Sequence, residues 1–527
     1  MRRILLCFLL ALSLASPAHA QTTAALLDTL QHSAFGFFWN EVNPANGLIR
    51  DRSAAGSTLS SIAAVGFGLS AIPIGIDHGW ITRAAGRSRV RTTLTTFYTG
   101  PQGTAALGTI GYKGFFYHFL NMNTATRYDT GVELSTIDTA LLFAGMLDAR
   151  QYFDDPSDPD EIAIRLMADS LFQRADFNFM RNFNPGIMMG WKPAFGFSGF
   201  GQWIGYNEAM ILYLEALGSP SYAVPTSAWS AWTSGYHYNT FFGQSYVSCP
   251  PLFTHQYSHC WVDFRNIADA YMRAKLEDYF ENSRRATLAQ HAYCVANPIG
   301  AIGYSDSLWG ITAGDGPFGY NARGAPPNQN DDGTITPTAA ISSIVFTPDI
   351  SIGFIQYMWD HFRPTVWGPY GWQDGFNLSV GNWVGPDVLG IDQGPILVMI
   401  ENYLTGKPWQ RVMSHPAIQQ GLARADFQPF ALGVGGPPPV AGLELGRVAP
   451  DPVTGHSRVS FRLAKPGEVT LDLLDLQGRA VLRLAAGPFA AGEHSEIVGR
   501  DGMPAGIYWL RLRAAGAERH SRFVVLP

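Results

Sequence analysis

The chain has 527 residues, of which 15% are charged and 13% are aromatic, and its formal net charge at neutral pH is −6. This length favours two to four domains, although a large helical barrel can hold more residues in one unit. An acidic chain without a basic patch excludes nucleic acid as a partner, whereas low charge and many aromatic side chains suit an uncharged glycan.

The first 20 residues have the three parts of a secretory signal peptide. Arginines occupy positions 2 and 3, the apolar run ILLCFLLALSLA follows, and the segment closes with the triplet AHA. We therefore expect the mature chain to begin at Gln21 and to be exported to the periplasm, the cell surface or the medium. Later apolar runs are shorter than the ~18 residues that a membrane-spanning helix needs, so we expect no transmembrane segment.

The apolar residues between 22 and 422 recur with helical period, and strand-like alternation is scarce there. The helical segments are 22–40, 57–79, 82–98, 135–152, 159–176, 206–217, 226–242, 263–281, 283–296, 337–343, 349–362 and 391–404. Long loops join them, and loops of such length in a compact domain usually carry function. This pattern favours an all-α toroid of two concentric helix rings, and period alone leaves another all-α arrangement open.

The mature chain keeps three cysteines, Cys249, Cys260 and Cys294. An odd number is unusual for an exported protein, because disulfides form in pairs in oxidising compartments. A disulfide between Cys249 and Cys260 is one option that the sequence leaves open.

The composition changes at Gly433. The segment GVGGPPPV, residues 433–440, is typical of a stiff linker. Residues 441–527 alternate apolar and polar side chains between Gly and Pro turns, which predicts a small β-sandwich. This segment has 11 Lys and Arg against 9 Asp and Glu, so the acidity belongs to the helical domain, residues 21–432.

Seven strings within residues 25–427 resemble, in order, the glycoamylase-like bacterial proteins that include glycoside hydrolase family 144. They are GLIRDR, ELSTIDTALLFAGML, GYNEAMILYLEALGSP, HQYSHCWVDFR, ENSRRATLAQHAYC, DDGTITPTAAISSIVFTPD and GIDQGPILVMIENYLTG. The resemblance implies an (α/α)6 barrel and inverting, endo-acting hydrolysis of β-1,2-glucan, with exo-acting sophorose-releasing enzymes as relatives. The strings LDLLDLQGRAV and GMPAGIYWLRL resemble an immunoglobulin-like domain of the flagellar hook-capping type.

Hydrolysis of a glycosidic bond needs one carboxylic acid to protonate the leaving oxygen and a second carboxylate to activate water or attack carbon. Glu208 opens an apolar helix, where desolvation would raise its pKa as a general acid requires. Glu133 and Asp138 in ELSTID match the family's acidic strip and are the remaining catalytic candidates. Each has a structural alternative. Glu208 and Asp138 could be first-turn acids stabilised by the helix dipole, with Ser135 and Asp138 forming a capping box, and Glu133 could be a solvated loop acid.

Further side chains could bind sugar rings or instead fix the loops through salt bridges. The candidates for substrate binding are Arg50, Asp51, Arg52, Trp191, Lys192, His255, Tyr257, Arg265, Trp309, Asp315 and Asp392. The spacing of His255, His259 and Asp263 could hold a metal on one helix face, but the glutamate of the zinc-protease motif is missing. We expect no metal and no cofactor. Substrate contact by His255, Tyr257 and Arg265 is the favoured interpretation of this segment, and a packed cluster of Asp263 and Arg265 is its structural alternative.

The sequence thus predicts a secreted hydrolase of β-1,2-glucan. A retaining transglycosylase and an exo-acting sophorose-releasing hydrolase on the same barrel are the alternatives among enzymes. A non-catalytic glucan-binding surface protein is the alternative from another class, although binding alone would tolerate amides at the acidic positions. The sequence leaves the oligomeric state open.

Overall fold

The computed structural model describes residues 22–430 and, with gaps at 447, 449–452, 454–455, 464, 476–478, 501–502 and 515–516, residues 443–525. The predicted signal peptide, residues 1–20, and the predicted linker, residues 433–440, lie outside the described residues. The chain divides into two compact units, Met1–Phe430 and Ala431–Pro527.

The inner ring of the first unit consists of helices that are buried on nearly every side. They are α2 (Ile62–Asp77), α4 (Thr136–Tyr152), α7 (Met210–Gly218), α11 (Pro337–Ile341) and α14 (Gly390–Leu404). A helix that is apolar all round needs protein on all sides, which places these helices at the centre. Two 3₁₀ turns, η1 (Leu252–His255) and η2 (Ser258–Cys260), occupy the remaining inner position.

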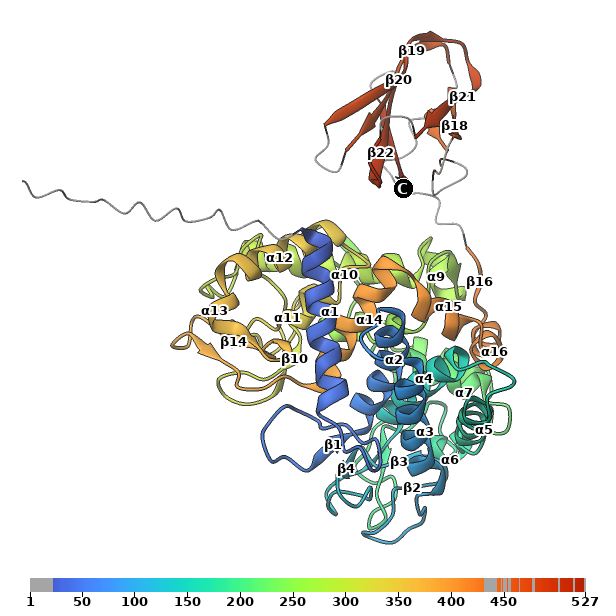
Figure 1. Ribbon diagram of the computed structural model, residues 1–527, viewed down its shortest axis with the longest axis vertical. Coiled ribbons are helices and arrows are strands. Elements are labelled where there is room, and N and C mark those ends of the chain that lie inside the picture. The colour runs from blue at the N-terminus through green and yellow to red at the C-terminus, as the bar shows by residue number, and fades with distance from the viewer. Residues whose placement is uncertain are drawn as a thin grey trace, which may run out of the picture. The chain divides into compact units, whose positions relative to one another are not determined.

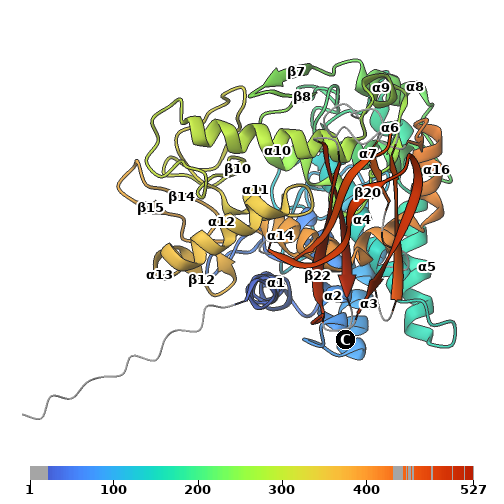
Figure 2. The same cartoon turned by 90° about the horizontal axis from the view of Figure 1, so that it is seen from above.

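Helices with one apolar face form the outer ring. They are α1 (Thr23–Asn40), α3 (Arg83–Thr99), α5 (Pro159–Gln173), α10 (Tyr279–Ala296) and α12 (Pro348–His361). Helix α1 stands upright in Figure 1 and is seen end-on in Figure 2, where it packs against α2 and α14. The two rings are the all-α toroid that the sequence predicted.

The two inner helices α2 and α4 meet backbone to backbone. A Cβ added to Gly66 would collide with the carbonyl group of Leu141, and one added to Gly145 would collide with the carbonyl group of Gly66. Only glycine permits this approach, because any larger side chain would push the helices apart. The contact fixes α2 and α4 relative to each other.

Shorter elements complete the first unit. The helices are α6 (Phe177–Arg181), α8 (Ser227–Thr233), α9 (Ala270–Lys275), α13 (Arg363–Val366), α15 (Lys407–Met413) and α16 (Pro416–Arg424). Antiparallel strand pairs tie the long loops together: β1 (Leu59–Ser61) with β4 (Phe119–Asn121), β2 (Gly111–Tyr112) with β3 (Phe115–Phe116), β5 (Leu134–Ser135) with β6 (Gly190–Trp191), β7 (Tyr238–Phe241) with β8 (Gln244–Val247), β9 (Ile267–Ala268) with β16 (Gln428–Pro429), β10 (Ala313–Gly314) with β11 (Asn321–Ala322), β12 (Trp367–Gly368) with β13 (Gly371–Trp372), and β14 (Phe376–Asn377) with β15 (Trp383–Val384). No helix among the described residues is long and apolar enough to cross a membrane.

Two predicted helices differ from the structure. The segment 263–281 contains only α9 and the start of α10, because Asp269 and Asp278 each cap a separate helix, and Leu276 between them has a positive φ of 58°. The segment 226–242 forms the short helix α8 and then enters the β7–β8 hairpin. Asp side chains that accept backbone N–H bonds start new helices, which period counting does not detect.

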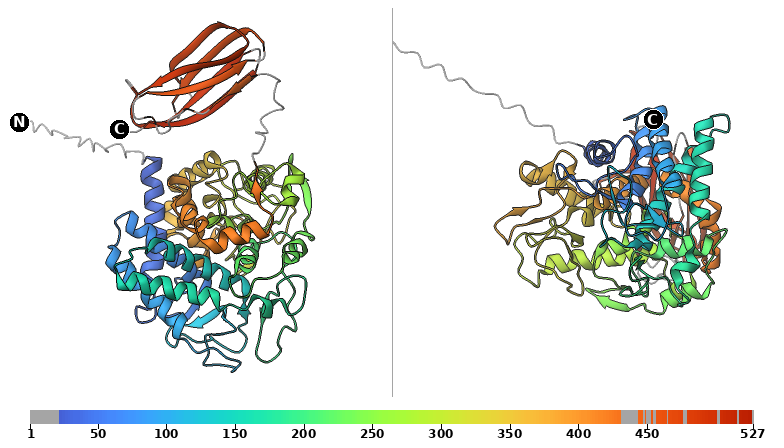
Figure 3. Two further views of the ribbon diagram at one scale, coloured as in Figure 1. Left: turned by 90° about the vertical axis from the view of Figure 1, so that its right-hand side faces the viewer. Right: turned by 90° about the horizontal axis from the view of Figure 1, so that it is seen from below.

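The second unit holds two antiparallel sheets around one core, and Figure 3 shows their strands side by side. One sheet has the order β17 (Leu443–Leu445), β18 (His456–Leu463), β21 (Gly492–Gly499). The second sheet has the order β20 (Ala480–Phe489), β19 (Gly467–Leu474), β22 (Gly506–Ala514), β23 (Ala517–Val525). The core joins Phe461 of the first sheet to Leu471 and Leu510 of the second. The immunoglobulin-like type of this unit stays a prediction.

Candidate active site

A cavity of about 310 Å³ opens where the first turns of several inner helices converge. It is lined by Asp51, Arg52, Ser61, His118, Phe119, Ile137, Asp138, Leu141, Glu208, Phe253, Tyr257, Tyr320, Leu389 and Ile391. Ser61 caps α2, Asp138 lies in the first turn of α4, and Glu208 comes two residues before α7. The positive ends of these helix dipoles therefore point at the cavity and favour anionic groups in its wall.

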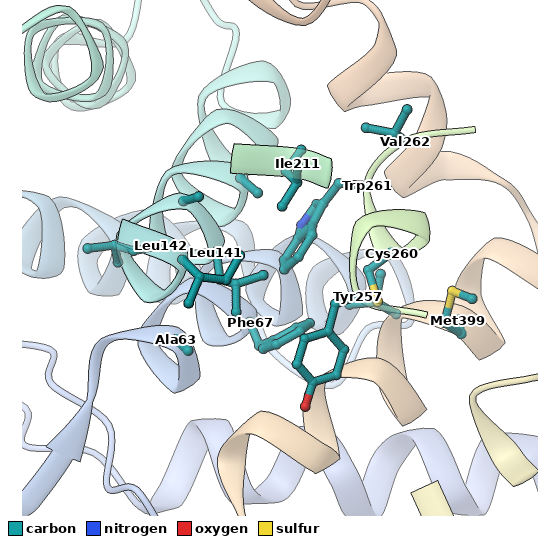
Figure 4. Close-up of a cluster of buried hydrophobic side chains, with 14 of the residues drawn as sticks. Ala63, Phe67, Leu141, Leu142, Ile211, Tyr257, Cys260, Trp261, Val262 and Met399 are labelled. Carbon is teal, nitrogen blue, oxygen red and sulfur yellow. The ribbon is translucent and has the colours of Figure 1, made fainter. Parts of the chain in front are cut away.

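An apolar cluster lies beneath the cavity. Figure 4 shows Phe67, Leu141 and Ile211 beside the rings of Tyr257 and Trp261. Phe67 stacks on Trp261 with ring centroids 4.8 Å apart and meets Tyr257 edge to face at 5.9 Å. Such close-packed rings exclude water, so charges in this wall interact more strongly than they would in solvent.

Glu208 is half-buried and has no cationic partner among the described residues. Desolvation raises the pKa of its carboxyl group to about 7, and the negative charge of Asp138 adds to this shift. The Ser258 hydroxyl donates to the Glu208 carbonyl oxygen at 3.2 Å and accepts from the Ile211 amide at 3.0 Å. These two bonds fix the turn that presents Glu208, and its carboxyl group can hold a proton near neutral pH.

Asp138 has the predicted capping geometry and also faces the cavity. Its amide donates to the Ser135 hydroxyl oxygen at 3.2 Å, and the same hydroxyl donates to the Asp138 carboxylate at 2.5 Å. The carboxylate also lies 3.4 Å from Nε2 of His118. The helix cap therefore accounts for only part of the contacts of Asp138, and the group can serve both stability and chemistry.

His118 is a site residue that the sequence did not single out. Its Nδ1 lies 2.9 Å from Oε1 of Glu133, so the imidazole bridges Glu133 and Asp138. Although burial opposes the charged imidazole, the two carboxylates raise the pKa of His118 to about 9. In turn, the hydrogen bond and charge of His118 outweigh burial and lower the pKa of Glu133. Glu133 does not line the cavity itself and contacts it through His118.

Asp51 and Arg52 bring the first predicted loop to the cavity. Arg52 donates to the carboxylate of Asp315 at 2.9 Å and to that of Asp51 at 3.4 Å. Burial raises the pKa of Asp51 despite the neighbouring guanidinium group. These groups form a polar wall that can bind sugar hydroxyls.

Asp392 forms a carboxyl pair with Asp374, which the sequence did not single out. Both are 3% exposed, and one oxygen of each lacks a partner in the described part of the chain. Burial raises the pKa of Asp374 to about 6, and burial together with Asp374 raises the pKa of Asp392 well above its usual range. Like charges this close cannot both ionise, so the pair shares a proton near neutral pH.

Known proteins resemble this chain in both sequence and fold. Residues 201–416 match the glycoamylase family model, described as "Putative glucoamylase". A solved structure from Bacteroides uniformis, described in the same words, is 34% identical, with a TM-score of 0.71 over 77% of this chain and 98% of that one. The chain belongs to the glycoamylase-like family.

Two further members of the glycoamylase-like family have specific names. An endo-β-1,2-glucanase from Chitinophaga pinensis, solved with sophorotriose and glucose, is 28% identical, and the likeness covers 78% of this chain and 100% of that one with a TM-score of 0.71. An exo β-1,2-glucooligosaccharide sophorohydrolase from Parabacteroides distasonis is 31% identical over 445 residues, which are 78% of this chain. The chain spans 59% of the length of that curated relative.

Several predicted binding residues of this glycoamylase-like chain lie near the cavity without lining it. Arg50 pairs with Glu41 at 2.6 Å rather than with Asp51. Trp191 is 8% exposed and stacks on Tyr112 with centroids 5.1 Å apart. Lys192 lies close enough for its charge to help lower the pKa of Glu133. Of these three residues, Lys192 is the one that acts electrostatically on Glu133.

Three predicted substrate contacts do not reach the cavity. His255 is fully buried, with Nε2 3.2 Å from the Cys249 carbonyl oxygen, and burial lowers its pKa to about 3. Trp309 is also fully buried. Arg265 pairs with Asp263 at 2.7 Å and lies over the ring of Trp409, away from the cavity. The segment HQYSHCWVDFR therefore forms core turns and a surface ion pair, and of its predicted binding residues only Tyr257 lines the cavity.

The sequence left a disulfide between Cys249 and Cys260 open, and in the structure Cys249, Cys260 and Cys294 are free. Cys260 and Cys294 are buried and Cys249 is half-buried. In the part of the chain that the structure describes, no group of three or more His, Cys, Asp or Glu side chains is arranged to hold a metal.

Proposed function

We propose that the chain hydrolyses β-1,2-linked glucan, cutting within the polymer with inversion of configuration. The observation that carries this proposal is the cavity in which a carboxyl group with a raised pKa, Glu208, lies across from Asp138, whose carboxylate is bridged by His118 to Glu133. Hydrolysis of a glycosidic bond needs one carboxyl group that donates a proton and a second that accepts one.

Glu208 is the proposed general acid. A pKa of about 7 leaves a large share of the carboxyl groups protonated near neutral pH, ready to protonate the leaving oxygen. Tyr257, 5% exposed beside the same cavity, and Phe253 supply ring surfaces against which a glucose ring can stack.

Asp138 is the proposed general base, with Glu133 and His118 as positioning residues. Below about pH 9 the imidazole of His118 already carries its proton, so it cannot accept another from water. Its positive charge instead lowers the pKa of Glu133 and so favours the ionised form of that carboxyl group. Asp138 is the member of this trio whose carboxylate lines the cavity, and so it is placed to take a proton from the attacking water.

The named relatives support β-1,2-glucan as the substrate class, because one is an endo-β-1,2-glucanase and another an exo-acting sophorohydrolase. We keep the exo mode as the alternative to endo cutting, since both modes occur among these relatives. A retaining transglycosylase would instead give products of unchanged anomeric configuration, and a non-catalytic glucan-binding protein would give no products.

The test incubates the purified mature chain with linear β-1,2-glucan, laminarin, cellulose and starch, each with and without a chelator. We expect new reducing ends only with β-1,2-glucan, and unchanged rates with the chelator. Early products of mixed length support endo cutting, whereas sophorose alone from the start supports the exo mode. Proton NMR of fresh products distinguishes inversion from retention, and absence of any product from β-1,2-glucan overturns the proposal.

We further propose export of the mature chain across the inner membrane. The signal-peptide pattern of residues 1–20 supports it. Cell fractionation of the native host tests it, and accumulation of the processed chain in the cytoplasm would contradict it.

A further inference from the structure

The four-stranded sheet of the second unit has one face in the core and one face outward. Leu471 of β19, Leu510 of β22 and Phe523 of β23 are fully buried. Because side chains alternate along a strand, the residues between these positions share the opposite face. Cross-strand pairing arranges them in rows across β20, β19, β22 and β23.

The middle row of this outer face is Arg483, Asp472, Arg511 and His520. Asp472 accepts from Arg483 at 2.7 Å and from Arg511 at 3.1 Å, and it is 1% exposed beneath them. The hydrogen bond from Arg483, followed by that from Arg511, lowers the pKa of Asp472. One ionised carboxylate thus holds two guanidinium groups flat on the sheet and leaves a net positive charge there.

The adjacent row contains Leu474, Trp509 and Arg522 as register neighbours. Trp509 is 38% exposed although Leu474 beside it is 5% exposed. Arg522 is exposed and makes no ion pair with any residue that the structure describes. An indole ring therefore lies open on the face beside an unpaired guanidinium group.

The same face is basic in a chain that is acidic overall. Four arginines, Arg483, Arg511, Arg513 and Arg522, stand against three carboxylates, Asp472, Glu518 and the exposed Glu468 near the start of β19. The whole chain carries a formal charge of −6. The net negative charge of the whole chain would therefore repel a polyanion, so a polyanion could bind only at a locally basic surface such as this face.

We propose that this outer face binds an acidic polysaccharide, meaning a glycan that carries carboxylate or phosphate groups. A guanidinium fork matches the geometry of both anions, and the face of an indole ring can stack on a sugar ring. Strands about 4.8 Å apart present these groups as a flat platform, which suits an extended glycan rather than a small ligand. A lipid surface would need several protruding apolar side chains in one patch. Within the two rows described above Trp509 alone is a large exposed apolar residue, and the other exposed apolar residues of this sheet, Val481 and Leu482, lie on its edge strand β20.

Native gel electrophoresis of the full mature chain tests the proposal, with polygalacturonate, neutral dextran or no polymer in the gel. The double variant Trp509→Ala with Arg522→Gln removes the open ring and the unpaired cation, and leaves the pairs of Asp472 intact. The matched control is Arg458→Gln, an exposed cation on β18 of the opposite sheet that donates to the Ser495 hydroxyl. Melting temperatures verify that each variant is folded.

We expect polygalacturonate to retard the wild type and the control, with less retardation as salt is added. The double variant should bind at least about tenfold more weakly, since stacking on an aromatic ring alone is worth about that much. Equal retardation of wild type and double variant, or none of the wild type, overturns the proposal. Binding to phosphatidylglycerol vesicles without binding to polygalacturonate would overturn it in favour of a lipid. Activity on soluble β-1,2-glucan, measured in parallel, separates this outcome from the fate of the proposed function.

Discussion

On the two sides of the cavity, the pKa values of carboxyl groups are shifted in opposite directions. On the α7 side Glu208 has no cation beside it in the described structure, and desolvation raises its pKa to about 7. On the α4 side Glu133 is also withdrawn from water, yet His118 lowers its pKa. The presence of the His118 imidazole on one side only thus pushes the two pKa values apart. Such a difference suits the group with the raised pKa to donate a proton and the other side to accept one.

The largest expected effect comes from the wall without a cation. Replacement Glu208→Gln keeps the shape of the side chain but removes its proton, so turnover on β-1,2-glucan should fall by about 10²–10⁴-fold. Oligosaccharide affinity and melting temperature should stay near those of the wild type. Steady-state kinetics and isothermal calorimetry measure turnover and affinity, and a variant that keeps turnover within about tenfold would place the acid elsewhere.

On the α4 side of the cavity, we expect Asp138 and Glu133 to have different roles. Asp138→Asn should lower turnover by about 10²–10⁴-fold, as expected for Glu208→Gln. It should also lower the stability of the fold, since a weakened helix cap costs about 0.5–2 kcal/mol. Glu133→Gln should lose rate alone, by about tenfold, because it acts through His118. Parallel melting curves and initial rates check both, and a stability loss confined to Glu133→Gln would reverse the assignment.

His118→Gln tests the imidazole itself. Without the cation the pKa of Glu133 should rise, so the acid limb of the pH–rate profile should move to higher pH while the alkaline limb set by Glu208 near pH 7 stays. We expect turnover at the optimum to fall by roughly tenfold to a hundredfold. His291→Gln, whose ring bonds the Asp306 carbonyl oxygen away from the cavity, serves as control. An acid limb that does not move would separate His118 from the carboxylates.

A third carboxyl group sharpens the comparison through stability. Glu215 lies two turns beyond Glu208 on α7, fully buried, with both carboxylate oxygens unpartnered in the described structure, and burial raises its pKa well above the usual range. A raised folded-state pKa gives full stability below the ordinary pKa near 4.5 and loses about 1.4 kcal/mol for each pH unit above it, up to the folded-state pKa.

As the pH rises from about 5 to about 8, the melting temperature of Glu215→Gln should therefore fall less than that of the wild type. Glu161→Gln provides the contrast, because Arg83 holds the Glu161 carboxylate with two bonds of 2.8 Å and this variant should melt lower at neutral pH. Differential scanning calorimetry across this range measures both. Parallel curves for the wild type and Glu215→Gln would mean that the Glu215 carboxyl group finds a charge partner.

The smallest expected effect concerns the second unit. A chain ending at Ala431 should keep its rate on soluble β-1,2-glucan within about twofold, because every cavity residue lies in the first unit. Initial rates at equal concentration of folded protein check this. A well-folded truncated chain without activity would show that the second unit contributes to the site.

The sequence predicted the toroid and the carboxyl groups of both cavity walls, because these leave local signals. Inner helices such as α2 contain long apolar runs in the sequence, and Ser135 followed by Asp138 indicates a helix N-cap. No local pattern marks His118 or Asp374, since each is a single polar residue in a short loop. Their importance comes from partners that lie elsewhere in the chain. Glu208 and Glu215 look alike in sequence, and only the structure shows that Glu208, the proposed general acid, lines the cavity whereas Glu215 is fully buried.

The seven-string resemblance located the family but not the roles within each string. In HQYSHCWVDFR, residues 255–262 are all buried, and the chain reaches the surface only at Arg265. Two short 3₁₀ turns, η1 and η2, lie in this region in place of one continuous helix, so the four-residue spacing of His255, His259 and Asp263 does not put their side chains on one helix face. The burial of His255 and the outward pairing of Arg265 depend on packing that the composition of the string does not reveal.

Because Cys249, Cys260 and Cys294 form no disulfide, the fold of the first unit should not depend on the redox state of its surroundings. Burial raises the pKa of Cys249 to about 12 and that of Cys260 far above its usual range, so almost no reactive thiolate exists in the folded state. The first unit should consequently mature equally well with or without an oxidant. A thiol-specific dye should label the fully buried Cys260 and Cys294 only when the first unit unfolds, so the rate of labelling would report its unfolding.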